Sequence, residues 1–363
     1  MHKFFTLLGV IILLAVSMTA TMAQDEIAGW VCPAGYEGQT LRIFSWSTYV
    51  AEDTIPNFEE SCGVKVEYYE FGSNDELMAV IRSGIARYDL AVPSEANIAR
   101  LTGEGLLQPL DFSIITNVKN VSEKFLNPPY DPGNVYSVPY QWGTAGIAYD
   151  ATIVDGEIGS WEDLFNYDGP VAWIDDSRTM LSVALLLLGY DPNSKNPDEI
   201  QEAKDYLLAH SDNVDAIASE NGQDMLLRGD MDVVVEWSGD LLQIIEDCEC
   251  DDFVYVIPEE GTNIWVDNMA VPANAENPRL AMEFINYILD PQVGADLSNF
   301  TSYGSPNQAA IDAGLIDESA LNNPGIYPPE ETLQKMYFLL DVGAEADQYY
   351  TEVWNDILAA LSE

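Results

Sequence analysis

Short apolar runs alternate with amphipathic segments through the first third of the chain. Residues 64–68 alternate apolar and polar positions, which is typical of a half-buried strand. Within residues 74–83 the apolar side chains Leu77, Val80 and Ile81 share one face, which predicts an amphipathic helix. By the same criteria we predict strands over residues 41–46, 64–68 and 88–93, and helices ending near 61 and over 74–83 and 98–105.

A second group of elements begins beyond residue 136. The segment 136–143 continues into an apolar run at 145–149, and we interpret it as a crossing between two lobes. Residues 265–271 are the candidate return crossing. Asn277-Pro278 then predicts a helix start, because Asn is a favourable cap and Pro suits the first turn. The remaining pattern predicts strands at 171–174 and 233–237 and helices at 177–189, 198–209, 222–229 and 332–361.

This order of elements predicts an α/β fold in two lobes. Strands that alternate with helices form sheets with helices on their faces, so each lobe is expected to be a mixed, mainly parallel sheet flanked by helices. The crossings form a hinge between the lobes. We expect residues 40–142 plus 268–312 in lobe one and 143–267 plus 313–363 in lobe two. Ligands bind beyond the carboxyl ends of such strands, where the chain places Trp46, Ser47, Tyr49 and Ser94.

The first 23 residues differ from the rest of the chain. Lys3 precedes an apolar run from Phe4 to Val16, and small residues at Thr21 and Ala23 suit cleavage after Ala23. The run is shorter than the roughly 18–20 residues that a spanning helix needs. Residues 1–23 are therefore predicted to be a secretory signal peptide, with a short membrane anchor as the rival interpretation. The mature protein would lie in the periplasm or another extracytoplasmic space, and residues 24–39 would form an N-terminal extension.

The charge balance excludes some functions. The chain has 61 acidic and 14 basic residues, a formal net charge of −47. Binding to a nucleic-acid backbone requires basic surface, so we expect no nucleic-acid partner. The acidity attracts cations over long range at low salt. A solubility or high-salt adaptation explains it better, because no small ligand needs dozens of carboxylates.

Four cysteines indicate disulfides in an exported protein. They are Cys32, Cys62, Cys248 and Cys250, and three pairings can be drawn among them. We favour Cys32–Cys62, which would tie the N-terminal extension to the first lobe. Cys248 and Cys250 would then pair locally or stay reduced. A zinc site is disfavoured, because its usual signature has two such cysteine pairs or added histidines.

The sequence lacks the signatures of common catalytic and cofactor sites. Histidine occurs only at His2 and His210, which makes a Ser-His-Asp triad or a histidine-rich zinc site improbable. The G-x-S-x-G, P-loop and dinucleotide-binding motifs are absent. We therefore expect no enzyme activity, catalytic residue, metal or cofactor. A secreted hydrolase that uses paired carboxylates is the rival from another class.

Several sequence blocks occur in the order seen in one protein family. They begin with Ile43–Val50, Tyr88–Ser94 and Tyr136–Gly143. Asp175-Asp176, Glu236–Asp240, Ile264–Pro272 and Tyr303–Asn307 follow. Together these blocks resemble the spermidine/putrescine-binding proteins of bacterial ABC transporters. The resemblance implies a two-lobed, type II-like periplasmic binding-protein fold that closes on an amine, and ABC permease subunits as partners of what we expect to be a monomer.

The resemblance also implies a set of ligand-binding residues. Aromatic residues would line the interlobe site, carboxylates would bind the amines, and two serines would supply hydroxyl or backbone contacts. These are Trp46, Tyr49, Trp237, Trp265 and Tyr303; Asp176, Asp240 and Asp267; and Ser47 and Ser94. The assignment agrees with the chemistry of a polyamine. Aromatic faces hold its methylenes and attract its charges, and a desolvated ammonium needs an anionic acceptor.

Four positions depart from the family pattern. Thr48 and Thr179 stand where acidic residues are common, and Ala96 and Leu339 stand where the spermidine-type pattern has an aromatic residue and an amide. These losses argue against tight binding of a triamine. Asp240 matches the putrescine-preferring branch and favours a diamine. Two further rivals are a protein of the same fold for a different solute, such as a sugar, ferric iron or an anion, and a sensor that presents bound amine to a receptor.

Overall fold

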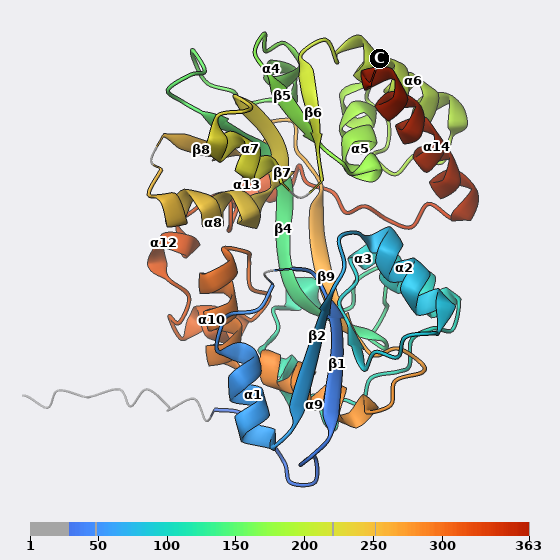
Figure 1. Ribbon diagram of the computed structural model, residues 1–363, viewed down its shortest axis with the longest axis vertical. Helices are drawn as coiled ribbons and strands as arrows, with labels where there is room; N and C mark the ends of the chain where they lie inside the picture. Colours follow the sequence, from blue (N-terminus) through green and yellow to red (C-terminus); the bar gives the residue numbers. More distant parts are fainter. Residues whose placement is uncertain (1–28, 48, 220, 251, 363) are drawn as a thin grey trace, which may run out of the picture.

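The computed structural model, shown in Figure 1, describes residues 29–47, 49–219, 221–250 and 252–362. The predicted signal peptide lies outside these residues. The strands of the described residues are β1 (Thr40–Ser45), β2 (Lys65–Glu70), β3 (Leu90–Ala91), β4 (Ser137–Asp150), β5 (Val171–Ile174), β6 (Val214–Ala218), β7 (Val233–Trp237), β8 (Phe253–Val256) and β9 (Ile264–Ala270).

Two long strands join two groups of parallel strands. The strand order is β2-β1-β3-β9-β4-β7-β5-β6, with β8 also paired to β4. β1 is parallel to β2 and β3 at one end of the molecule, and β5 is parallel to β6 and β7 at the other. The central strands β4 and β9 pair antiparallel and run between the two ends (Figure 1). The fold is therefore α/β with two lobes, and antiparallel pairing is as prominent in it as parallel pairing.

Helices cover both ends of this sheet (Figure 1). In the first half of the described chain they are α1 (Thr54–Cys62), α2 (Asn74–Ser83), α3 (Glu95–Gly103), the 3-10 helices η1 (Thr116–Asn120) and η2 (Glu123–Phe125), α4 (Trp161–Phe165) and α5 (Ser177–Leu187). The later ones are α6 (Pro197–Ala209), α7 (Gly222–Arg228), α8 (Ser238–Cys248), α9 (Pro278–Ile288), α10 (Pro291–Thr301), α11 (Gln308–Asp312), α12 (Glu318–Leu321), α13 (Glu330–Leu333) and α14 (Ala344–Leu361). None of these helices has the length and apolar character needed to cross a bilayer.

Local sequence explains the best-defined helix boundaries. The hydroxyl of Ser73 caps α2 by accepting the N–H of Glu76 at 3.2 Å, and Gly84 ends the helix with a φ of 62° that favours glycine. Leu77 and Ile81 are buried as the predicted apolar face requires. Pro278 starts α9 as expected. The side chain of Asn277 makes no capping hydrogen bond, however, and its amide nitrogen donates to the carbonyl of Thr40 at 2.9 Å.

Each lobe has its own apolar core. Leu41, Phe58 and Phe284 belong to a buried cluster in the lobe that contains β1. Trp161 and Trp173 belong to a cluster in the other lobe, where α14 packs against α5 and α6. The half-buried Trp237 at the end of β7 packs against both clusters, so it lies where the two lobes meet.

The C-terminal region differs from the predicted helix. Residues 332–361 do not form one helix, because helix is found only at α13 and α14 and the segment between them is irregular. In that segment Tyr337 pairs with Asn263 beside β9. Ile316, just beyond the predicted lobe boundary at residue 313, packs with Ala295 and Ala310. Sequence periodicity did not reveal β6, β8 and α8.

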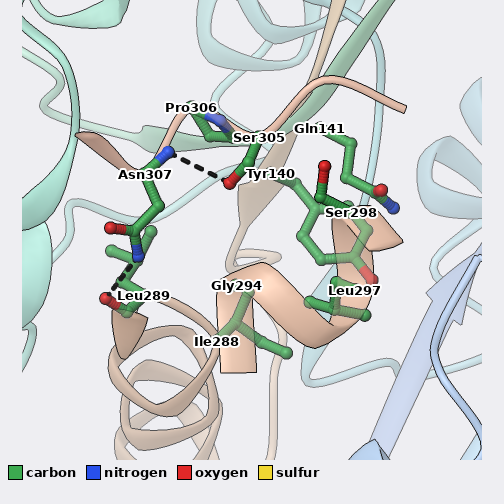
Figure 2. A pocket seen from close by; sticks show the side chains of 10 residues that line it. All are labelled: Tyr140, Gln141, Ile288, Leu289, Gly294, Leu297, Ser298, Ser305, Pro306 and Asn307. Atoms are coloured by element: carbon green, nitrogen blue, oxygen red, sulfur yellow. Dashed lines mark hydrogen bonds between the residues drawn. The ribbon is translucent and has the colours of Figure 1, made fainter. Parts of the chain in front are cut away.

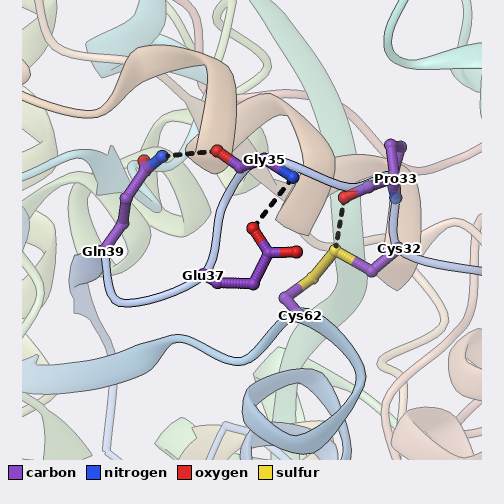
Figure 3. Close-up of a disulfide and its surroundings, with 6 residues drawn as sticks. All are labelled: Cys32, Pro33, Gly35, Glu37, Gln39 and Cys62. Carbon is purple, nitrogen blue, oxygen red and sulfur yellow. Dashed lines mark hydrogen bonds between the residues drawn. A yellow bond between two sulfur atoms is a disulfide. The ribbon is translucent and has the colours of Figure 1, made fainter.

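A disulfide ties the N-terminal extension to α1 (Figure 3). Cys32 is joined to Cys62, the last residue of that helix, as the sequence analysis favoured. Nearby, Trp30 stacks on Phe58 at 5.6 Å and donates its backbone N–H to Asp290 at 2.7 Å. Cys248 and Cys250 form a second, local disulfide. The extension is therefore covalently and non-covalently attached to the first lobe.

We expect the two disulfides to differ in their contribution to stability. Cys32 and Cys62 are 30 residues apart and Cys248 and Cys250 only 2, and cross-linking a longer loop removes more entropy from the unfolded chain. The C32A/C62A variant should lose about 3 kcal/mol of unfolding free energy. C248A/C250A, the matched control, should lose clearly less. Urea unfolding followed by circular dichroism measures both, and equal losses would contradict this account.

Candidate functional site

The predicted ligand residues occupy the ends of elements near the centre of the molecule. Trp46 and Ser47 follow β1, and Ser94 immediately precedes α3. Trp237 ends β7, Asp240 lies in the first turn of α8, and Tyr303 follows α10. Trp265 and Asp267 lie in β9 itself. The topology thus brings together residues that are far apart in the sequence, such as Tyr49 and Tyr303, whose ring centroids lie 5.6 Å apart.

Asp267 is the centre of a buried hydrogen-bond network. Its side chain accepts the hydroxyl of Tyr49 at 2.9 Å and the hydroxyl of Ser94 at 2.7 Å. The amide of Asn74 in turn donates to the hydroxyl of Ser94 at 3.0 Å. Asp267 is only 4% exposed. Among the described residues, neither lysine nor arginine forms an ion pair with it.

Burial makes the negative charge of Asp267 costly. Loss of solvation raises the pKa of this carboxyl to about 7, although the hydrogen bonds from Ser94 and Tyr49 act in the opposite direction. Burial and the neighbouring Asp267 charge also raise the pKa of Tyr49 well above its usual range. Tyr49 therefore stays a neutral hydrogen-bond donor, and a cation beside Asp267 would stabilise the charged form of that carboxyl.

Aromatic rings continue from this network towards the second lobe. Tyr49 meets Tyr303 edge to face with centroids 5.6 Å apart. Tyr303 meets Trp265 at 4.9 Å, and Trp265 meets Trp237 at 6.1 Å. Such rings offer electron-rich faces and apolar area together. They form a continuous aromatic wall from Asp267 to the end of β7.

A second carboxylate, Asp240, lies next to this wall. Burial raises the pKa of this acid to about 6, and the neighbouring Tyr303 hydroxyl acts in the opposite direction. Burial and the negative charges of Asp240 and Asp267 raise the pKa of Tyr303. Two partly desolvated acids thus flank one aromatic ring, which suits a ligand with separated positive charges.

Glycines allow the rings to approach the backbone closely. A Cβ at Gly239 in α8 would overlap the ring of Tyr303. A Cβ at Gly143 in β4 would lie 2.6 Å from the Trp265 ring. The positions of Tyr303 and Trp265 therefore depend on the absence of a side chain at Gly239 and Gly143.

Three predicted residues lie outside this network. Trp46 packs on Phe71 at 4.5 Å and is half-buried against the same core as Tyr49. Ser47 is exposed. Asp176 caps α5 by accepting the N–H of Thr179 at 2.7 Å, and burial raises its pKa. Its predicted role in ligand binding stays a prediction, as do those of Trp46 and Ser47.

Several residues that support the site were not predicted from the sequence. Tyr140 packs edge to face on Tyr49 at 5.2 Å, and its hydroxyl donates to the Tyr49 carbonyl. It lies where the β4–β9 register shifts between Pro139 and Gln141, so a proline inside an apolar strand was the available signal. Glu95, buried beside Ser94, was also missed.

A separate cavity lies between β4, α9 and α10 (Figure 2). It is lined by Tyr140, Gln141, Ile288, Leu289, Gly294, Leu297, Ser298, Ser305, Pro306 and Asn307. Within it, Asn307 donates its side-chain amide to the carbonyl of Leu289 at 3.0 Å. None of the predicted ligand residues lines this cavity. It adjoins Tyr140 and is separate from the candidate site.

The fold and the site together define a class of protein. Two lobes joined by long crossing strands, with buried acids and aromatic rings where the lobes meet, are the features of an extracytoplasmic solute-binding protein. The described residues contain no cluster of three or more acidic, cysteine or histidine side chains that suits a metal ion. Residues 54–324 match the bacterial extracellular solute-binding proteins, and the chain belongs to this family.

The chain is similar over most of its length to individual proteins of this family. The putrescine-binding periplasmic protein SpuD of Pseudomonas aeruginosa is 32% identical, over 94% of this chain and 97% of the relative. The spermidine/putrescine-binding periplasmic protein of Escherichia coli is 33% identical over 95% and 96%. The spermidine/putrescine ABC transporter substrate-binding protein PotD of Streptococcus pneumoniae superposes with a TM-score of 0.79 at 32% identity, covering 89% of this chain and 100% of that one. These matches confirm the family predicted from the sequence blocks.

The close packing at Gly239 gives a testable prediction. G239A places a methyl group against Tyr303, so the ring must move from its position beside Asp240. Although alanine favours helix, we expect a net loss of about 1–3 kcal/mol of stability and a changed near-ultraviolet circular dichroism spectrum. G103A in α3 is the control, since nothing lies within 4 Å of that added Cβ. A G239A variant as stable as G103A would show that Tyr303 is not held in this way.

Proposed function

We propose that this protein captures a polyamine, putrescine or spermidine, outside the cytoplasmic membrane and delivers it to the permease of an ABC transporter. The observation that carries the proposal is the buried Asp267, which is held by Tyr49 and Ser94 without a cationic partner among the described residues. The names of the relatives from Pseudomonas aeruginosa and Escherichia coli agree with this ligand class.

The carboxylate sets the charge of the ligand. A buried anion without a cation is unfavourable, and a ligand ammonium would supply the missing charge. Sugars offer no formal charge, and an anion would meet repulsion from Asp267 and Asp240. The site chemistry therefore favours a cation over the neutral and anionic solutes that other proteins of this fold could carry.

The aromatic wall sets the shape of the ligand. Rings of Tyr49, Tyr303, Trp265 and Trp237 can pack against methylene groups between two charges. Each cation–π contact contributes about 0.5–2 kcal/mol. A linear diamine has apolar carbon between its ends, whereas a hydrated metal ion would gain nothing from this wall.

Two acids at the Tyr303 ring favour a diamine. Asp267 and Asp240 would each take one ammonium group, with Tyr303 between them. Asp176, which caps α5 away from these rings, would contribute to a longer amine. Putrescine is thus the preferred ligand, in agreement with the losses at Ala96 and Leu339.

Delivery follows from the two-lobed fold. β4 and β9 connect the lobes, and Trp237 lies where their cores meet. A ligand that contacts β9 and α8 together would stabilise the closed arrangement, which a permease could then recognise. We assign no catalytic residue and no cofactor, and we expect the protein to act as a monomer.

The central test is a substitution at Asp267. D267N keeps the size of the side chain and removes the charge, so amine binding should weaken by about 2–5 kcal/mol. D155N is the matched control, because Asp155 is an exposed acid whose loss changes the net charge equally. Calorimetric titration with putrescine measures both. An unchanged affinity in D267N would remove Asp267 from the site.

The ligand ranking tests the proposal as a whole. Titrations with putrescine, cadaverine, spermidine and spermine should show saturable one-to-one binding near micromolar or tighter, about −8 kcal/mol, at moderate and high salt. Putrescine should bind best. Weak multi-site binding that high salt abolishes would mean that amines only coat the acidic surface, and the proposed ligand would be wrong. Turnover of a glycoside panel would instead support a carboxylate-based hydrolase.

A further inference from the structure

Glu95 is a buried acid beside the candidate amine site. It is 2% exposed and is the first residue of α3, directly after Ser94. Its carboxyl oxygen accepts the backbone N–H of Val266 at 3.1 Å. Ser94, the residue before Glu95, donates to Asp267, the residue after Val266. Two adjacent contacts between the start of α3 and β9 therefore hold the two acids.

The groups that face Glu95 compensate only part of the cost of its buried charge. Asp267 faces it from β9 and repels it, Arg178 of α5 attracts it, and Tyr130 faces it from the loop before β4. One guanidinium nitrogen of Arg178 donates to the side-chain oxygen of Asn193 at 3.1 Å and to the carbonyl of Leu340 at 3.2 Å, and no salt bridge joins Arg178 to Glu95 among the described residues. From α2, the neutral amide of Asn74 bonds to Ser94. Within the described residues, Glu95 has no ion pair.

Two like charges in one buried region are unfavourable together. Burial raises the pKa of Glu95 to about 8, and the charge of Asp267 adds to this effect. The pKa of Asp267 is itself raised to about 7. At neutral pH, one carboxyl of the Glu95–Asp267 pair is therefore protonated in at least a fraction of the empty molecules.

We infer that Glu95 is a second acidic group of the Asp267 site, which carries a proton while the site is empty and releases it to solvent when a ligand ammonium enters. This inference rests on the proposed polyamine function. The O–H bond of the Glu95 carboxyl breaks, its proton goes to the buffer, and the carboxylate left behind faces the ammonium. The ligand itself stays protonated, because alkyl amines lose their proton only near pH 10.

The consequence is a pH-dependent affinity with a defined sign. At low pH the ligand must displace the proton from Glu95, so binding is weaker. As the pH rises from about 6 to about 8.5 the proton is lost beforehand and binding strengthens. Glu95 would thus compensate for the acidic residues that Thr48 and Thr179 replace.

E95Q tests this role. Glutamine can still accept the N–H of Val266 and resembles the protonated acid, so at about pH 6 the putrescine affinity should stay within about twofold of the wild type. At about pH 8.5 it should be roughly tenfold weaker, because the added charge is missing. Calorimetry in two buffers of different ionisation enthalpy counts released protons, and E95Q should release fewer. E157Q, at an exposed glutamate, is the control.

The outcomes separate this inference from the proposed function. A wild type that binds no polyamine refutes the proposed function. A wild type that binds putrescine without releasing protons, or an E95Q variant weakened equally at both pH values, refutes the role of Glu95 alone. If E95Q does not fold, infrared difference spectra of wild type labelled with ¹³C-carboxyl glutamate decide the question. A protonated glutamate band must disappear when putrescine binds, and its persistence would overturn the inference.

Discussion

The negative charge of Asp267, buried in a strand that connects the two lobes, is the constraint on which the rest of the site depends. An acid in this position is tolerable only if hydrogen-bond donors hold it, and Tyr49 and Ser94 do so from the first lobe. The hydrogen bonds that they donate offset only part of the free-energy cost of desolvating the Asp267 carboxylate. A ligand cation would remove that remaining cost, so the same burial that destabilises the empty site favours the occupied one.

The aromatic wall follows from the position of that acid. Tyr49 both holds Asp267 and starts the series of rings that continues through Tyr303 and Trp265. Those rings fit only because Gly143 and Gly239 leave space on the neighbouring backbone. The wall therefore depends on residues without side chains as much as on the aromatic ones, and it connects an acid in β9 with an acid in α8.

The surface acidity and the site acidity have different physical meanings. A formal charge of −47 spread over the chain acts at long range and weakens as salt screens it. Asp267 and Glu95 act at short range in a buried region, where screening by salt is small. Selectivity for an amine can arise from the buried acids and the aromatic wall but not from the exposed carboxylates, because exposed carboxylates attract any cation.

The sequence by itself determined the α/β class, the position of most elements and the family. Strong local signals explain this success: the capped α2 spans residues 74–83 as predicted, and β5 and β7 match because each is a short, buried apolar run. The tail was wrong because Tyr337 pairs beside β9, and long-range pairing overrides local periodicity. Only the tertiary structure decided which candidate residues meet. It joined Ser94, Asp267 and Tyr49 and placed Glu95 beside Asp267, because contacts between residues far apart in the sequence depend on how the strands are arranged rather than on the local sequence.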